Sequence, residues 1–351
     1  MKKKQLTFLI TGGTGFLGCH LAADLLKRGH RVKLLDLEPL TEPALWGKVE
    51  NYQGDIRNKF LVEKLTEGVD FVIQAAAALP LAKAKEIRTT TVDGTRIVLE
   101  AARKNKVKRV VYISSTAVYG VPKKHPILES DPRVGVGAYG EAKIEAEKIC
   151  ENFRKKKMIV PIIRPKTFIG TGRLGVFQIL FDWVRRGCKI PVIGDGDNRY
   201  QLLGVEDLVS AVWLTMSKPA KTANDNFNVG AKKFETVKKD LTKFFKAVKS
   251  ESKVMKTPAN TIKKTLAILE KLRLSPLYAW VYATADRDSF VSTAKIEKKL
   301  GWRAKYSNAD TLIRTFEWYA KHWKNYEKST GITHRVAWKQ GALKIARWVL
   351  R

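Results

Sequence analysis

The feature that most constrains the fold is a regular alternation of short apolar runs and helical patterns over residues 6–164. The apolar runs predict strands at 6–10, 31–36, 69–75, 109–114 and 159–164, with a further short stretch near 49–52. The helical patterns predict helices at 16–28, 92–104 and 139–153. Strands and helices that alternate in this way form a parallel sheet with helices on its faces. The sequence therefore predicts an α/β fold with a doubly wound parallel sheet.

After residue 164 the regular alternation ends. Helices are predicted at 176–186, 205–216 and 311–326, a Lys-rich helical segment at 237–274, and short strands at 190–193 and 227–229. This organisation predicts one main domain and a smaller, discontinuous C-terminal cap. The main domain is expected to span 1–165 and to be completed by about 201–230. The cap is expected at 166–200 and 231–330, followed by a basic amphipathic tail at 331–351.

A glycine-rich turn lies between the first predicted strand and its helix. Residues 11–18 read Thr-Gly-Gly-Thr-Gly-Phe-Leu-Gly. In such a turn Gly12 permits the tight bend, Gly15 lets the backbone approach a pyrophosphate, and Gly18 allows close packing of helix on strand. The helix N-terminus then offers free N–H groups and a partial positive charge to the anion. This context predicts a dinucleotide-binding (Rossmann) domain.

An acidic residue at the end of the second strand indicates which dinucleotide is bound. Asp36 follows Gly18 by 18 residues, where a carboxylate binds the ribose 2′-hydroxyl and repels a 2′-phosphate. NAD is therefore expected rather than NADP. Asp55 and Ile56 are expected to flank the adenine, and residues 75–77 to pass close under the cofactor. The predicted cofactor-binding residues are Gly12, Thr14, Gly15, Phe16, Leu17, Gly18, Asp36, Asp55, Ile56, Ala75, Ala76, Ala77 and Lys143.

Tyr139 and Lys143 are four residues apart and share one face of the predicted helix at 139–153. A free tyrosine has a pKa of about 10, so ionising it near neutrality requires ~4 kcal/mol of preferential stabilisation. Lys143 and a positive nicotinamide ring can supply that stabilisation. Tyr139 would then take the proton of a substrate hydroxyl as hydride leaves its carbon. Ser115 follows the strand at 109–114 and is expected to hydrogen-bond the same oxygen.

Taken together, these segments resemble the extended short-chain dehydrogenase/reductase superfamily, and within it the NAD-dependent epimerase/dehydratase family. The resemblance extends to about residue 319 and rests on the motifs at 11–18, 54–55, 92–95, 114–120, 139–143, 164–165, 205–208, 228–230 and 300–302. It implies an enzyme with Ser115, Tyr139 and Lys143 as catalytic residues and a small-molecule substrate. It also implies a homodimer formed through the helices at 92–104 and 139–153.

The chain departs from the family pattern around the substrate. The 4,6-dehydratases of the family carry Thr-Asp-Glu where this chain has residues 115–117, Ser-Thr-Ala, so dehydration is not expected. Thr167 stands where epimerases usually have Asn, Gly204 replaces a His, and the diphosphate-binding Arg corresponds to Arg199, displaced by one position. The resemblance thus implies Thr116, Thr167 and Arg199 as substrate-binding candidates. The replacements remove residues that usually contact a UDP-sugar and leave the redox centre intact.

The chain is strongly basic, with a net charge of +32, and residues 231–351 alone hold 28 basic and 10 acidic side chains. Such a charge fits an anionic membrane, anionic substrates or a well-solvated surface. No nucleic-acid-binding motif accompanies it, so no nucleic-acid partner is expected. The segment 335–351 has no acid and carries an apolar stripe among basic residues. This pattern fits a helix lying on an anionic membrane surface, and equally a terminal helix packed on the protein's own body.

The sequence lacks the usual signals for secretion and membrane insertion. Its apolar runs fall short of the roughly 18 residues that a spanning helix needs, and Met1 to Lys4 lead into a strand without a cleavage site. The three cysteines are widely spaced and form no C-x-x-C motif, which favours a reducing compartment without disulfides or a metal site. A cytoplasmic protein is expected, peripheral at the membrane if its tail binds there.

Three functions remain open on the sequence. The first is an NAD-dependent epimerase or oxidoreductase that acts on a nucleotide-sugar or lipid-linked sugar. The second is a dehydrogenase of a lipid alcohol, of the 3β-hydroxysteroid type, which the missing nucleotide contacts and the basic C-terminal third favour. The third is a non-catalytic NAD-binding regulatory protein. The presence of Ser115, Tyr139 and Lys143 argues against the third, because a sensor needs only the glycine turn.

Overall fold

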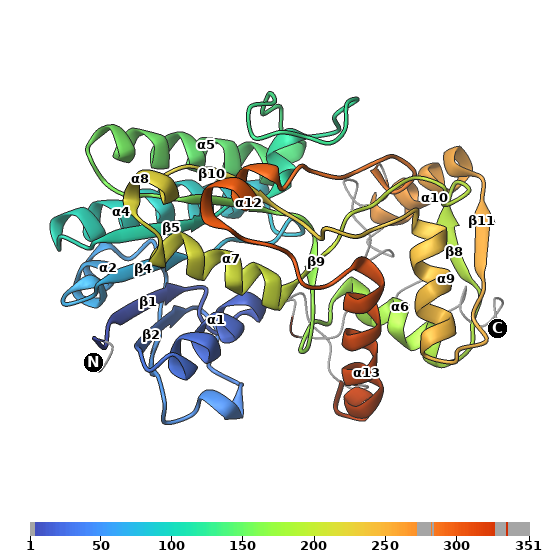
Figure 1. The fold of residues 1–351 in the computed structure, drawn as a ribbon, viewed down its shortest axis with the longest axis horizontal. Coiled ribbons are helices and arrows are strands. Elements are labelled where there is room, and N and C mark those ends of the chain that lie inside the picture. Colours follow the sequence, from blue (N-terminus) through green and yellow to red (C-terminus); the bar gives the residue numbers. More distant parts are fainter. Residues whose placement is uncertain (1–3, 272–281, 283, 327–334, 336–351) are drawn as a thin grey trace.

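One seven-stranded parallel sheet forms the centre of the computed structural model, which describes residues 4–271, 282, 284–326 and 335. The strands follow the order β10-β6-β5-β4-β1-β2-β3 (Figure 1). Their bounds are β1 Thr7–Thr11, β2 Arg31–Asp36, β3 Glu50–Gln53, β4 Phe71–Gln74, β5 Arg109–Ile113, β6 Ile162–Pro165 and β10 Asn226–Val229. The strand order reverses between β1 and β4, which is where open parallel sheets bind ligands. The predicted fold class is confirmed.

Helices cover both faces of this sheet (Figure 1). Helices α2 (Lys59–Thr66), α4 (Gly94–Lys104) and α5 (Gly137–Lys155) pack on one another over one face. Helices α1 (Phe16–Lys27) and α7 (Val205–Ser217) pack together over the other. A π-helical turn, Thr89–Asp93, leads directly into α4, so the predicted helix at 92–104 starts earlier than expected.

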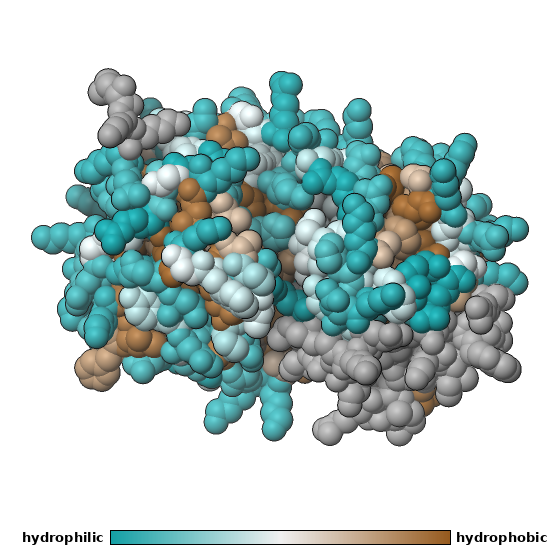
Figure 2. Space-filling model, turned by 90° about the horizontal axis from the view of Figure 1, so that it is seen from below, coloured by the Kyte–Doolittle hydropathy of each residue, from teal (hydrophilic) through white to brown (hydrophobic). Residues whose placement is uncertain are grey.

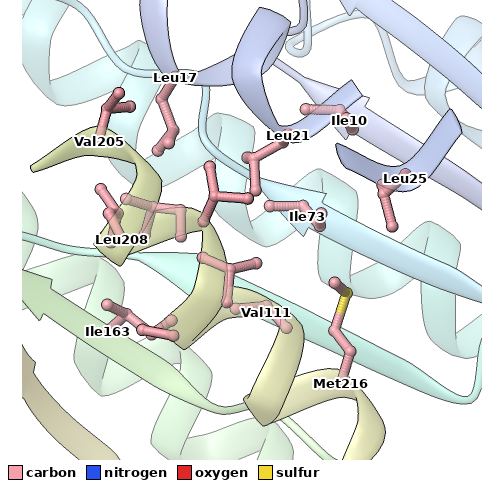
Figure 3. Packing of buried hydrophobic residues seen from close by; sticks show 14 of the residues in the cluster. Ile10, Leu17, Leu21, Leu25, Ile73, Val111, Ile163, Val205, Leu208 and Met216 are labelled. Carbon is pink, nitrogen blue, oxygen red and sulfur yellow. The ribbon is translucent and has the colours of Figure 1, made fainter. Parts of the chain in front are cut away.

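The core forms because successive strand residues point to opposite faces. In β1, Phe8 and Ile10 join the cluster under α1 and α7, whereas Leu9 joins the cluster under α2, α4 and α5. Figure 3 shows the first cluster, to which Leu21 of α1 and Leu208 of α7 both belong. Burying such a side chain contributes about 1.5–3 kcal/mol, so these two layers hold the sheet and its loops in place.

The elements after β6 gather around a second, aromatic core. Helices α6 (Val176–Arg185), α9 (Val237–Ala247) and α13 (Asn308–Tyr326) each contribute one ring to a cluster of Phe181, Phe244 and Phe316. The ring centroids lie 5.5–6.2 Å apart in edge-to-face contacts, the arrangement that aromatic quadrupoles favour. Two small parallel pairs accompany them, β8 (Ile190–Ile193) with β11 (Val254–Thr257) and β7 (Phe168–Ile169) with β9 (Leu203–Gly204).

The predicted Lys-rich helical segment at 237–274 is wrong in its middle. Helix α9 ends at Ala247, and Lys249 adopts a left-handed conformation with φ 54°. The chain then pairs with β8 as strand β11, before α10 (Ala259–Lys271) begins. The β-branched residues of Val254–Thr257 and the free edge of β8 outweigh the helical propensity of the surrounding lysines. The predicted end of this segment, 272–274, lies outside the described residues.

A short helix returns from the end of the chain to the main sheet. Helix α12 (Ala294–Leu300) packs on β10, and Trp302 is buried in the same cluster as α1 and α7. The Trp302 indole donates to the carbonyl of Asp207 at 3.1 Å, and the Asp207 carboxylate accepts the backbone N–H of Lys305 at 2.8 Å. Hydrogen bonds therefore hold the motif at 205–208, at the start of α7, against the motif at 300–302, which follows α12. The remaining short elements are α3 (Ala84–Arg88), α8 (Ala220–Ala223) and the 3₁₀ turns Pro43–Leu45 and Thr116–Tyr119.

Candidate active site

A cavity of about 450 Å³ opens at the carboxyl ends of β1 and β4. Every residue predicted to bind the cofactor lines it, together with Tyr139. These are Gly12, Thr14, Gly15, Phe16, Leu17, Gly18, Asp36, Asp55, Ile56, Ala75, Ala76, Ala77 and Lys143. The cavity therefore joins the glycine turn to the tyrosine and lysine of α5.

The glycine turn is built so tightly that no side chain fits at Gly12 or Gly18. Gly12 has φ +69°, and a Cβ there would lie 2.8 Å from the backbone nitrogen of Ala76. A Cβ on Gly18 would lie 2.3 Å from the carbonyl oxygen of Gly12, which is shorter than any real contact. Ala76 is itself fixed, because its N–H donates to the Thr11 hydroxyl at 3.3 Å. Both glycines thus serve the close approaches that the sequence indicated.

Asp36 lies at the end of β2 beside the turn. Its Oδ2 accepts the backbone N–H of Thr14 at 3.0 Å, and its Oδ1 accepts that of Glu38 at 3.2 Å. The Thr14 hydroxyl donates to the carbonyl of Glu38 at 3.1 Å. These bonds hold the carboxylate at the cavity wall, where it can accept the hydroxyls of a ribose. A carboxylate placed here is unfavourable for a 2′-phosphate.

Asp55 and Ile56 line the cavity in different ways. The Asp55 carboxylate accepts the Arg57 guanidinium through both oxygens, with Nε at 2.9 and 3.0 Å, and this pairing holds the pKa of Asp55 below its usual value. Arg57 is shared with Glu86 and Thr89, so it ties the loop after β3 to α3. Ile56 is buried and supplies an apolar surface suited to a base.

Tyr139 and Lys143 come together in the first turns of α5. The Lys143 ammonium is buried, donates to the carbonyl of Ile113 at 2.8 Å and lies 5.9 Å from the Tyr139 ring centroid. Burial lowers the pKa of Lys143 to about 8, against the opposing effect of Glu147. This geometry fixes the ammonium between the end of β5 and the tyrosine.

Burial raises the pKa of Tyr139 to about 12, while a hydrogen bond with Ser115 and the charge of Arg173 act in the lowering direction. In the protein alone the phenol is therefore protonated at neutral pH. The ionised form expected from the sequence needs the positive charge of the nicotinamide ring in addition. Arg173 was not foreseen: its guanidinium lies 5.3 Å from the Phe16 ring and 5.8 Å from that of Phe168.

A buried ion-pair network holds α5 against the ends of β5 and β6. Glu147 has no exposed surface and binds the Arg164 guanidinium at 2.9 and 2.7 Å. It also accepts the Ser114 hydroxyl at 2.6 Å, and Arg164 donates to the Tyr119 hydroxyl at 2.7 Å. Because Glu147 is one helical turn after Lys143, the network sets the height of α5 over the strand ends.

The substrate-binding candidates do not lie on the cavity wall. Thr116 is buried in the first turn after Ser115. The Thr167 hydroxyl is 3.1 Å from that of Tyr200, and the Arg199 guanidinium covers the rings of Phe234 and Phe290 at 4.9 and 4.6 Å. The structure thus places Thr116 and Thr167 near the ends of β5 and β6, and engages Arg199 in aromatic contacts. Their role in binding substrate stays a prediction.

The cavity residues that the sequence analysis missed include Phe168 and Arg335. Phe168 follows Thr167 and stacks on Phe16 with centroids 5.9 Å apart. Its place three residues after the Arg-Pro motif was a usable signal. Arg335, in the predicted tail, donates to the carbonyl of Thr14 at 3.0 Å and pairs with Glu42 at 2.9 Å. It is more than 300 residues from the turn and outside any motif, so no sequence signal pointed to it. The rest of the segment 331–351 lies outside the described residues.

The described residues offer no group of three or more His, Cys, Asp or Glu side chains that could hold a metal ion. Cys19, Cys150 and Cys188 are buried and form no disulfide, and burial raises the pKa of Cys19 to about 11. None of the helices in the described part of the chain is long and apolar enough to cross a membrane.

Comparisons with known proteins bear directly on this site. The model of the NAD dependent epimerase/dehydratase family matches residues 8–230. An uncharacterized protein of Sinorhizobium fredii is 34% identical over 349 residues, covering 98% of this chain and 86% of that protein. The UDP-glucose 4-epimerase of Lactobacillus helveticus is 28% identical over 358 residues, covering 91% of this chain and 98% of the relative.

Solved structures share the fold. The Bordetella bronchiseptica enzyme WbmG, crystallised in complex with NAD, superposes with a TM-score of 0.74 at 22% identity, covering 96% of this chain and 98% of that one. The glycine turn, which has no room for a side chain at Gly12 or Gly18, fits the pyrophosphate of this cofactor. The carboxylate of Asp36 fits its ribose. The chain belongs to the NAD-dependent epimerase/dehydratase family of the extended short-chain dehydrogenases/reductases and has NAD as its cofactor.

Proposed function

We propose that the protein is an NAD-dependent epimerase or oxidoreductase that acts on a hydroxyl of a nucleotide-sugar or lipid-linked sugar. The observation that carries the proposal is the joint placement of Tyr139 and Lys143 on the wall of the cofactor cavity, with the Lys143 ammonium 5.9 Å from the centroid of the Tyr139 ring. A protein that only sensed NAD would need the glycine turn and Asp36 alone. The relatives named for 4-epimerisation of UDP-sugars support a sugar as the substrate.

The three residues have separate tasks in this proposal. Tyr139 accepts the proton of the sugar hydroxyl through its phenol oxygen, as a general base. Ser115 hydrogen-bonds the same oxygen and orients it, and the Lys143 ammonium favours the ionised phenol through its charge. Bound NAD supplies a reversible hydride acceptor for the carbon that bears the hydroxyl. In an epimerase the keto sugar then turns over, and Tyr139 returns the proton after hydride reaches the other face.

Dehydration is not part of the proposal. The positions before Val118 that hold an acid pair in the 4,6-dehydratases are occupied by Thr116 and Ala117. Neither side chain can donate or remove a proton near neutral pH. Both residues are buried in the 3₁₀ turn Thr116–Tyr119, and this turn has no acidic side chain.

The experiment is an NMR assay of the purified protein with UDP-glucose and NAD⁺, followed in parallel by absorbance of NADH. Formation of UDP-galactose without net NADH supports an epimerase, and stoichiometric NADH supports a dehydrogenase. Tyr139→Phe should lower the rate by about 10²–10⁴-fold while NAD binding persists. Full activity in this variant would refute the mechanism.

The lipid-alcohol dehydrogenase is the second candidate, and one observation favours it. Thr167 bonds Tyr200, and the Arg199 guanidinium lies on aromatic rings, so two positions that contact the nucleotide-sugar or its diphosphate in sugar-nucleotide enzymes are engaged within the protein. Incubation with a 3β-hydroxysteroid and NAD⁺ separates the two candidates, because only a dehydrogenase of this kind accumulates NADH there.

We also propose a homodimer through α4 and α5, which pack side by side over one face of the sheet. Peripheral binding to anionic membranes through the C-terminal tail is a further proposal. The basic composition of residues 231–351 supports it, and Figure 2 shows a face whose described part is mainly hydrophilic, with apolar patches between. Light scattering tests the dimer, and co-sedimentation with phosphatidylserine vesicles at low salt tests the membrane contact.

A further inference from the structure

Lys166 is a lysine buried beside the active site and unused by the mechanism. It follows β6 directly and is 2% exposed, placing it among the largest fully buried side chains of the protein. Burying an ammonium is costly unless a partner compensates its charge. A buried lysine at the carboxyl edge of the sheet therefore needs an explanation that packing alone does not provide.

The partners of Lys166 leave its charge uncompensated. Its Nζ donates to the Ser289 hydroxyl at 2.6 Å and lies 4.9 Å from the centroid of the Tyr200 ring. No carboxylate of the described residues is within ion-pair distance of this ammonium, in contrast to the buried Arg164 with Glu147. Burial lowers the pKa of Lys166 to about 7. An ammonium has three donors, and a single one of them has a hydrogen-bond acceptor among the described residues.

Polar side chains surround the ammonium near the protein surface and form a cluster of Lys166, Ser289 and Tyr200. Tyr200, Ser289 and Thr167 are each partly exposed, so the buried Nζ lies directly beneath residues that solvent reaches. Burial lowers the pKa of His125, Asp288 acts in the raising direction, and the charge of Lys166 acts in the lowering direction, so the imidazole lies within electrostatic range of the ammonium. Its buried Nε2 has no hydrogen-bond partner among the described residues. Lys166 and His125 thus each keep hydrogen-bonding capacity that no described residue satisfies.

This cluster lies at the same edge of the sheet as the catalytic residues. Strands β5 and β6 pair in parallel with Ile113 opposite Ile163, and the N–H of Ser114 donates to the Ile163 carbonyl at 2.8 Å. Ser115 is two residues after Ile113 and Lys166 is three residues after Ile163, so both follow the carboxyl ends of neighbouring strands. Neighbouring strands lie about 4.8 Å apart. A sugar whose hydroxyl contacts Ser115 and Tyr139 therefore has its neighbouring substituents on the side of Lys166.

We propose that Lys166, with Ser289 and His125, forms a binding subsite for a carboxylate on the sugar ring of the substrate, so that the protein selects an acidic sugar nucleotide. This inference rests on the proposed function. A carboxylate carries one negative charge, which one ammonium balances, and its two oxygens can accept from both Lys166 and His125. The carboxylate of a hexuronic acid is on C5, adjacent to a C4 whose hydroxyl reacts.

The diphosphate of the substrate fits the Lys166 subsite less well than a sugar carboxylate does. It is attached at C1, across the ring from C4, and so lies away from Ser115. It also carries more charge than one ammonium balances, and the nearby Arg199 guanidinium lies on the rings of Phe234 and Phe290. The subsite thus fits the sugar end of the substrate and not its nucleotide end.

Calorimetric binding of UDP-glucuronic acid and UDP-glucose to the NAD-loaded protein tests the subsite. The two ligands differ at C6, where one has a carboxylate and the other a hydroxymethyl group. We expect the wild type to bind the acid about tenfold more tightly or better, and Lys166→Met to abolish this preference. Lys189→Met, at an exposed lysine beside β8, should leave the preference unchanged. Without ligand, Lys166→Met should unfold at the same temperature as the wild type or higher, because it removes an uncompensated buried charge.

Each other outcome has a defined meaning. Equal binding of both ligands by the wild type overturns the carboxylate subsite and leaves the proposed function standing. An equal loss of both ligands in Lys166→Met assigns the lysine to the diphosphate and also overturns it. A strongly destabilised Lys166→Met overturns it in favour of a structural role. If the wild type binds neither ligand, the proposed UDP-sugar site fails, and the subsite fails with it.

Discussion

The cofactor side and the substrate side of the active site are built in different ways. On the cofactor side, the turn at 11–18, Asp36 and the segment 75–77 each follow one strand of the sheet, and all of them line one cavity. On the substrate side, Lys166 meets Ser289 and Tyr200, which come from segments far apart in the sequence. Within the first region each contact is prescribed by backbone geometry. In the second, the contacts depend on how separate segments fold over the strand ends.

The difference shows what a shared fold constrains. Gly12 and Gly18 have no room for a side chain, so any chain with this turn keeps the same cradle. Lys166 and Thr167 stand at positions where the backbone sets no such limit. The family's cofactor is therefore fixed by the fold, whereas in our proposal the substrate is selected by a few side chains at the ends of β5 and β6.

The largest effect, on stability, is expected from a substitution of Glu147, whose ion pair links α5 to the ends of β5 and β6. Replacing Glu147 by Ala leaves the Arg164 guanidinium buried and unpaired, which should lower the free energy of unfolding by about 3–5 kcal/mol. Urea unfolding followed by circular dichroism measures this loss. Glu145→Ala is the matched control on the same helix, because Glu145 pairs with Arg88 at the surface and should cost no more than about 1 kcal/mol. Equal losses in the two variants would show that the network does not hold α5.

The stability that Glu147 contributes should also depend on pH, and this effect is smaller. The bonds from Arg164 and Ser114 hold the pKa of Glu147 below its usual value despite burial. The unfolded chain therefore binds a proton on this carboxylate more readily than the folded one. The resulting stabilisation is present above the unfolded pKa of about 4.3 and is lost as pH falls through the lower folded pKa.

Glu147→Gln lacks this titration, so its stability difference from wild type should shrink as the pH falls from about 6 to about 3. Urea midpoints measured across that range for both proteins provide the test. A difference that stays constant over the whole range would mean that the Glu147 pKa is the same in the folded and unfolded states.

On the cofactor side, Asp36→Ala should weaken NAD binding by about 10- to 100-fold, which corresponds to the loss of hydrogen bonds to a charged group. It should also narrow the preference for NAD over NADP, because the repulsion of a 2′-phosphate disappears. Fluorescence titration with NADH and NADPH measures both. Asp195→Ala, at an exposed aspartate, is the control. An unchanged ratio of the two affinities would contradict the assignment of Asp36 to the ribose.

The same contrast explains how far the sequence could predict the molecule. The sheet, the turn and the positions of Tyr139 and Lys143 followed from periodicity and local motifs, because strand–turn–helix geometry is a local property. The split of the segment 237–274 did not follow, since β11 exists only through its pairing with β8. The contacts of Arg335 and the cluster around Lys166 could not be predicted from the sequence either. Their contacts join residues more than 40 to more than 300 positions apart, and single-sequence patterns carry no information on such pairs.

The smallest effect is expected at Thr167, on the substrate side. Thr167→Val keeps the shape of the side chain and removes the hydroxyl that bonds Tyr200 at 3.1 Å. If this hydroxyl also serves the sugar, the KM for the nucleotide-sugar should rise by about 2- to 10-fold, the value of one neutral hydrogen bond, while the affinity for NAD stays the same. Steady-state kinetics and NADH titration of the one variant measure the two regions separately. Thr242→Val, whose exposed hydroxyl bonds the Lys238 carbonyl within α9, should change neither quantity. A parallel change in NAD affinity would show that the two regions are coupled through Phe168, which follows Thr167 and lines the cofactor cavity.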